Sequence, residues 1–210
     1  REQELNVGVK LTQLLYASID PSLVNREILD QDVFSNSSVK YNELDDIVER
    51  ETSHGKVLIF THLKNGIVKK LVERYAKKGS IAITGDDDCN DGYRESLRCK
   101  FQEDPNTRVL VSTTVMNEGV DLTAATAIVN LTVPPTPNMH HQGVKRSHRI
   151  GAVKKESLRL YNLVTTVPGP QQSLDCAFLN MLAEKEKVVK YMMSGIVASK
   201  EELRELDEPG

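Results

Sequence analysis

The chain has 210 residues, of which 39% are apolar and 27% charged, and its formal net charge is −3. This composition is typical of a globular domain. Because the chain has no overall excess of positive charge, any nucleic-acid-binding site must be a local cluster of basic residues. No apolar run reaches the roughly 20 residues that span a bilayer and no signal-peptide pattern opens the chain, which predicts an intracellular protein without a membrane partner. Cys89, Cys99 and Cys176 show no CxxC spacing, so neither a disulfide framework nor a zinc site is expected.

A helical lead-in is predicted at the start of the chain (residues 1–55). Apolar residues recur at helical spacing in GVKLTQLLYASI (8–19), and this pattern breaks at Pro21. A second helix is predicted in SSVKYNELDDIVERETSHG (37–55), where a serine caps the start, the apolar residues share one face and Gly55 ends the pattern.

Short apolar segments then alternate with amphipathic helices. The predicted strands are KVLIF (56–60), SIAIT (80–84), RVLVST (108–113), TAIVNLTV (126–133) and LRLYNLVTT (158–166). The predicted helices are GIVKKLVERYAKKG (66–79), DGYRESLRCKFQED (91–104) and QQSLDCAFLNMLAEKEKVVKYMMSG (171–195). This alternation predicts an α/β domain over residues 56–195, with a parallel sheet covered by helices on both faces, and a solvated acidic tail at 196–210.

Two observations on the sequence concern phosphate binding and metal binding. The chain has no GxxxxGK[ST] and no strand that ends in a DExH-type acidic pair, so it cannot form a phosphate-binding P-loop of its own. TGDDDCNDG (84–92) places four carboxylates after a strand, which would suit a hard cation such as Mg²⁺. It lacks EF-hand spacing, and the same residues form polar loops, which is the interpretation we favour. No metal site is therefore predicted.

The stretch VSTTVMNEGVDLTAA (111–125) follows a buried strand, at the sheet edge where α/β proteins bind ligands. Thr113 and Thr114 can donate hydrogen bonds to phosphate oxygens. Gly119 allows close backbone approach, and Asp121 can accept hydrogen bonds from ribose hydroxyls. An ordinary strand end with a helix cap at either threonine fits the same residues.

A basic stretch, HHQGVKRSHRIGAVKKE (140–156), stands out in this slightly acidic chain. Arg146 and Arg149 are three residues apart and so share one face of a helix or turn, and each offers a planar fork of donors that matches phosphate oxygens. A solvated basic helix is the alternative. The histidines here have no acidic or cysteine partner at ligand spacing, so polar contacts are expected rather than metal binding.

Taken in order, these segments resemble the second RecA-like lobe of superfamily-two helicases, and within them the SWI/SNF-like DNA translocases. KVLIFTHLK resembles motif IV, STTVMNEGVDLTAATAIVNL resembles motif V, and QGVKRSHRIG resembles motif VI. The helical lead-in is also similar to that of the SWI/SNF-like group. The resemblance covers residues 11–195, and the order and spacing of the motifs are more specific than any single motif.

The resemblance implies a role for each matching residue. Arg146 and Arg149 would be the catalytic arginines that reach the γ-phosphate of ATP. Gly119 and Asp121 would border the nucleotide, while Gln142 would help to position the arginine pair or couple it to DNA. The implied nucleic-acid contacts are Thr61, His62, Lys64, Thr113, Thr114 and His148. Contacts of this kind with phosphate and sugar favour tracking along a strand over reading its sequence.

The resemblance also implies an activity, namely that of the C-terminal motor lobe of an ATP-dependent DNA helicase or translocase. ATP would lie between this lobe and an N-terminal RecA-like lobe of the same protein, which supplies the P-loop and the Mg²⁺ ligands. The chain starts at Arg1, which fits a piece of a longer protein, and alone it is expected to hydrolyse no ATP. Two alternatives are open: a non-catalytic helicase-like lobe that binds DNA or a partner protein, and the lobe of an RNA helicase.

Overall fold

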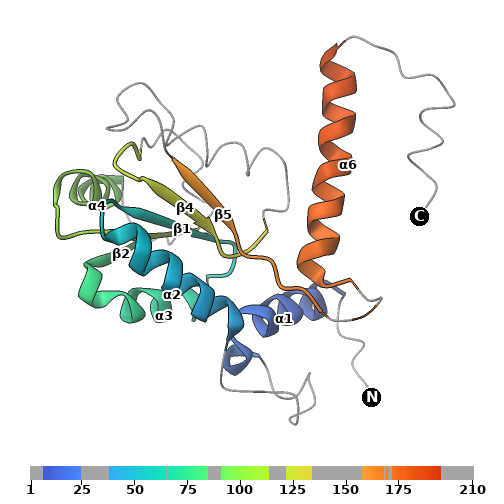
Figure 1. Ribbon diagram of the computed structural model, residues 1–210, viewed down its shortest axis with the longest axis horizontal. Coiled ribbons are helices and arrows are strands. Elements are labelled where there is room, and N and C mark those ends of the chain that lie inside the picture. Colours follow the sequence, from blue (N-terminus) through green and yellow to red (C-terminus); the bar gives the residue numbers. More distant parts are fainter. Residues whose placement is uncertain are drawn as a thin grey trace, which may run out of the picture.

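A parallel β-sheet forms the centre of the lobe (Figure 1). The computed structural model describes residues 7–24, 38–64, 66–84, 91–113, 122–133, 158–167, 169 and 172–194. Within these ranges the five strands lie in the order β2-β3-β1-β4-β5, and every neighbouring pair is parallel. The strands are β1 (Val57–Thr61), β2 (Ser80–Ile83), β3 (Val109–Thr113), β4 (Ala127–Asn130) and β5 (Arg159–Asn162). All five predicted strands are confirmed.

The helices also lie where the sequence predicts them. They are α1 (Val7–Ile19), α2 (Val39–Thr52), α3 (Ile67–Arg74), α4 (Asp91–Glu103) and α6 (Leu174–Ser194), with 3-10 turns η1 (Pro21–Leu23) and η3 (Ala76–Lys78). Ser38 caps α2, because its side chain accepts a hydrogen bond from the Tyr41 N–H. Gly79 ends η3 in the left-handed conformation, with φ 66°, which favours glycine.

Helices cover both faces of the sheet. Because side chains alternate along a strand, Val57 and Ile59 of β1 pack in one core with α1, α2 and α3, whereas Leu58 packs in a second core against Phe101 of α4. The predicted RecA-like α/β architecture is therefore confirmed, and Figure 1 shows α2 and α3 together on one side of the sheet.

The lead-in packs on the sheet rather than forming a core of its own. Leu44 and Ile47 of α2 belong to the same core as β1, and so do Tyr16 and Ile19 of α1. The division of the chain at residue 55 stays a prediction, and the predicted tail lies outside the described residues.

A polar network joins the lead-in to α3. Asp45 on α2 accepts two hydrogen bonds from Arg74 and a third from the Tyr75 hydroxyl, at 2.9 Å. The Arg74 guanidinium also lies over the Tyr41 ring, 5.2 Å from its centroid. Burial acts to raise the pKa of Asp45, but the hydrogen bonds from Arg74 and Tyr75 outweigh it and lower the pKa below its ordinary value.

Arg74→Met is expected to lower the free energy of unfolding by about 1 kcal/mol, since it removes a half-exposed ion pair and a cation–π contact. Because the pKa of Asp45 lies below 3.8, the loss should be complete above that pH and should shrink as the pH falls further. Urea denaturation at pH 7 and pH 3 measures both effects. Lys69→Met, which removes an exposed pair with Glu73, is the control, and an equal loss in both variants would contradict the prediction.

Candidate nucleic-acid and nucleotide interface

The carboxyl ends of the parallel strands meet at one edge of the sheet. From β1 the chain continues to β2 on one side, and from β4 it continues to β5 on the other. Because β1 and β4 are neighbours, the topological switch point lies between them. Open parallel sheets bind ligands outside their carboxyl ends at such a point. The residues that follow β1 and β4 therefore occupy the position expected of a ligand site.

The turn that ends β1 is built by Thr61, which is fully buried. Its Oγ1 accepts a hydrogen bond from the Leu63 N–H at 3.1 Å and donates to the Leu63 carbonyl at 3.3 Å. The Thr61 hydroxyl therefore both donates and accepts a hydrogen bond within this turn. Lys64, the next predicted contact, is exposed. The contacts of both residues with nucleic acid stay predictions.

His62 is hydrogen-bonded to Thr132, which follows β4. These hydrogen bonds join the exits of β1 and β4, that is, the residues that follow the two strands at the switch point. The Thr132 Oγ1 accepts the His62 main-chain N–H at 3.0 Å and lies 2.7 Å from its Nδ1. Thr132 is 2% exposed and no other acceptor for its hydroxyl hydrogen is described, so we assign this hydrogen to Nδ1 and the ring proton to Nε2.

The imidazole of His62 is neutral. Burial lowers its pKa to about 4, and its Nε2 is buried without a hydrogen-bond partner among the described residues. A neutral imidazole offers a hydrogen bond but no charge. The charge needed to attract a phosphate backbone must therefore come from other residues.

Thr113 at the end of β3 lies opposite Thr61 in the sheet register. It is 4% exposed, and its Oγ1 is buried without a partner among the described residues. A buried polar atom without a partner costs about 1–3 kcal/mol, so it is uncommon in native structures. The structure thus brings Thr61 and Thr113, two predicted contact residues, together at the carboxyl edge of the sheet. The Thr113 hydroxyl has no hydrogen-bond partner among the described residues.

The other predicted site residues cannot be placed. Thr114, Gly119, Asp121, Gln142, Arg146, His148 and Arg149 lie outside the described residues. Their roles at the nucleotide or the nucleic acid stay predictions. In the described part of the chain, no group of three or more His, Cys, Asp or Glu side chains could hold a metal ion. No helix in that part combines the length and apolar character that crossing a membrane requires.

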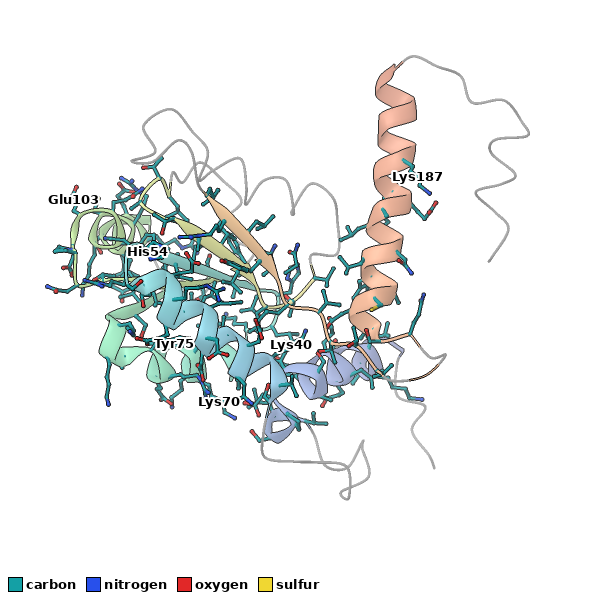
Figure 2. All side chains as sticks on the ribbon, in the orientation of Figure 1. Lys40, His54, Lys70, Tyr75, Glu103 and Lys187 are labelled. Atoms are coloured by element: carbon teal, nitrogen blue, oxygen red, sulfur yellow. The ribbon has the colours of Figure 1, made fainter. Side chains whose placement is uncertain are left out.

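Sequence reasoning missed a buried ion pair near this edge. Lys40 Nζ lies 2.6 Å from Asp175 Oδ2, and the side chains are 4% and 1% exposed. Burial lowers the pKa of Lys40, although Asp175 acts to raise it. Figure 2 shows Lys40 where α2 comes close to the base of α6. One signal existed: Lys40 precedes Leu44 by four residues and therefore lies on the apolar face of α2.

The fold and its switch point define an open α/β lobe, and comparison with known proteins identifies its family. Residues 39–151, more than half of the chain, match the model of the helicase conserved C-terminal domain. The chain therefore belongs to this family.

Three curated relatives support the SWI/SNF-like assignment. The chain is 31% identical over 133 residues to the TATA-binding protein-associated factor mot1 of Schizosaccharomyces pombe, covering 62% of this chain and 7% of the relative. It is 33% identical over 137 residues to the SWI/SNF-related matrix-associated actin-dependent regulator of chromatin subfamily A-like protein 1 homolog of Caenorhabditis elegans, covering 64% and 18%. It is 25% identical over 215 residues to the chromatin-remodeling ATPase INO80 of Debaryomyces hansenii, covering 96% and 15%.

The chain thus spans less than a fifth of the length of each of these relatives. Among solved structures, the C-terminal part of the Fun30 ATPase domain has a TM-score of 0.60 at 20% identity, over 76% of this chain and 50% of that chain. This likeness supports the fold. The prediction of a second RecA-like lobe of a superfamily-two helicase, similar to the SWI/SNF-like group, is confirmed.

Proposed function

We propose that this chain is the C-terminal motor lobe of an ATP-dependent DNA translocase. The family match over residues 39–151 carries the proposal, and the polar residues at the switch point of the sheet support it. ATP lies between this lobe and an N-terminal RecA-like lobe of the same protein, which supplies the P-loop and the Mg²⁺ ligands. Opening and closing of the two lobes moves the protein along DNA, at an intracellular site.

In this proposal, the nucleotide contacts come from motifs V and VI. Arg146 and Arg149 neutralise the charge that develops on the transferred phosphoryl group, an effect worth roughly 10³–10⁵ in rate. Gly119 and Asp121 border the nucleotide, and Gln142 helps to position the arginine pair. A lobe with a purely structural role would need none of these residues.

The proposed nucleic-acid contacts come from the ends of β1 and β3 and from motif VI. The exposed Lys64 supplies positive charge, and the Thr113 hydroxyl, which has no partner among the described residues, supplies a hydrogen-bond donor for a phosphate oxygen. Thr61, His62, Thr114 and His148 are proposed to lie along the same backbone. Contacts with phosphate and sugar carry no direct sequence information, so the proposed contact is independent of sequence.

DNA is favoured over RNA by the relatives, because two of them are named for chromatin. The alternative from another class is a non-catalytic lobe that binds DNA or a partner protein. DNA binding by itself does not separate the two, since both functions allow it. The deciding measurement is ATP turnover in a protein that contains both lobes.

The purified 210-residue chain is expected to hydrolyse no ATP at a useful rate, with or without DNA, because it has no P-loop. A longer protein with both lobes is expected to turn over ATP faster when duplex DNA is added than when RNA is added. DNA-stimulated turnover by the chain alone would contradict the proposal. A two-lobed protein that binds DNA without turnover would favour the non-catalytic alternative, and stronger activation by RNA would favour an RNA helicase.

A further inference from the structure

The exit of β4 is held by contacts from several parts of the lobe. The Leu131 N–H donates to the Phe60 carbonyl at 2.9 Å, and Lys40 Nζ donates to the Leu131 carbonyl at 3.3 Å. The next residue, Thr132, is bound to His62. Leu131 and Thr132 are 0% and 2% exposed. This short buried stretch therefore leaves the sheet in one defined direction.

Lys40 links this exit to elements outside the sheet. Its Nζ pairs with Asp175 in the first turn of α6, and Asp175 Oδ2 also accepts the N–H of Thr165, which follows β5, at 2.8 Å. The ammonium group thereby joins α2, α6 and the exit of β4. The carboxylate joins α6 to the exit of β5. The two exits and two helices are thus held at one point.

Stability alone does not explain this pair. The desolvation of a buried ion pair offsets much of its attraction, and an apolar pair of similar volume is often as stable. The second carboxylate oxygen of Asp175 is buried without a partner among the described residues, which adds to the cost. An apolar pair, however, cannot donate a hydrogen bond to the Leu131 carbonyl. The distinctive contribution of Lys40 and Asp175 is therefore geometric.

We propose that Lys40 and Asp175 are positioning residues that fix the direction in which the chain leaves β4 at the switch point. The inference rests on the proposed function, because residues 134–157, which follow this exit in the sequence, carry the two arginines assigned to the nucleotide. The pair acts through Leu131 and contacts neither ATP nor DNA. It also makes the position of the β4 exit depend on that of α6.

The test uses variants of the longer, two-lobed protein. Lys40→Met removes the donor but keeps a long, unbranched side chain. It is expected to lower the kcat of DNA-stimulated ATP turnover at least about tenfold, with the KM for ATP and the Kd for duplex DNA within about twofold of wild type. Lys70→Met is the control, because Lys70 also ties the lead-in to the lobe, through an ion pair with Asp20 at 2.7 Å that does not involve β4. It is expected to leave all three quantities unchanged.

A double variant separates positioning from stability. Lys40→Met combined with Asp175→Leu replaces the ion pair with apolar side chains, so its melting temperature is expected to lie above that of Lys40→Met alone, which leaves the Asp175 carboxylate buried without its cation. Its kcat is expected to stay low, because the Leu131 carbonyl still lacks its donor. If Lys40→Met alone fails to fold, kcat and hydrogen exchange are compared between the double variant and the wild type. Hydrogen exchange at residues 131–133 is expected to be faster in both Lys40 variants and unchanged in Lys70→Met.

The outcomes separate the two proposals. Recovery of kcat together with the melting temperature in the double variant would overturn the positioning role. Unchanged hydrogen exchange at residues 131–133 would overturn it as well. A wild-type protein without DNA-stimulated turnover would contradict the proposed function instead, and the exchange measurement would then still decide whether Lys40 holds the exit of β4.

Discussion

Arg149→Lys in the longer protein is expected to lower DNA-stimulated ATP turnover by at least about a thousandfold while ATP binding is nearly unchanged. Arginine presents a planar fork that contacts two phosphate oxygens together, whereas lysine keeps the charge as a single point and loses this geometry. A contact that strengthens only as charge develops in the transition state affects kcat rather than the dissociation constant of ATP. Single-turnover hydrolysis and binding of a fluorescent nucleotide measure the two quantities separately.

Arg98→Lys is the control for this substitution. Arg98 pairs with Glu95 on the surface of α4, so the same change of chemistry there is expected to leave turnover and ATP binding as in the wild type. If Arg149→Lys retains DNA-stimulated turnover, the assignment of this arginine to the nucleotide is wrong, even though the family and the fold remain. If both variants lose turnover, the loss does not depend on a contact with the nucleotide.

The elements of the fold could be predicted because each one is encoded locally. A continuous apolar run such as KVLIF predicts a strand buried on both faces, and every residue of β1 is buried except the half-buried Phe60. The spacing of Ile67, Val68 and Leu71 predicts one buried face of α3, and all three are buried. The order of the strands in the sheet could not be predicted in this way, because it depends on pairings between segments far apart in the chain.

The candidate site could likewise be predicted only in part. The residue types at the carboxyl edge could be predicted, since Thr61, His62 and Thr113 directly follow or end strands. Their partners could not. His62 is bound to a threonine 70 positions further along, and Lys40 is bound to a carbonyl 91 positions further along. Such contacts follow from the packed tertiary structure and leave no periodic pattern in the sequence.

His62→Gln is expected to remove a pH dependence of stability that the wild-type chain shows between pH 7 and pH 5. In the unfolded chain the pKa of His62 is near its ordinary value of 6.5, whereas burial lowers it to about 4 in the folded chain. As the pH falls from 7 to 5, the unfolded chain therefore binds a proton that the folded chain does not bind. The free energy of unfolding is expected to fall by roughly 2 kcal/mol from this residue alone.

Urea denaturation of wild type and variant at the two pH values measures this difference. Glutamine does not titrate, and its main-chain N–H can still donate to the Thr132 hydroxyl, so the variant should lose about 2 kcal/mol less than the wild type between pH 7 and pH 5. His54→Gln, at a histidine that is 43% exposed, is the control for the substitution itself. Equal losses in wild type and His62→Gln would mean that folding does not lower the pKa of His62, so that the folded chain also binds this proton as the pH falls to 5. A charged His62 would then contribute to the electrostatic attraction of a phosphate backbone, which the neutral residue leaves to cations such as Lys64.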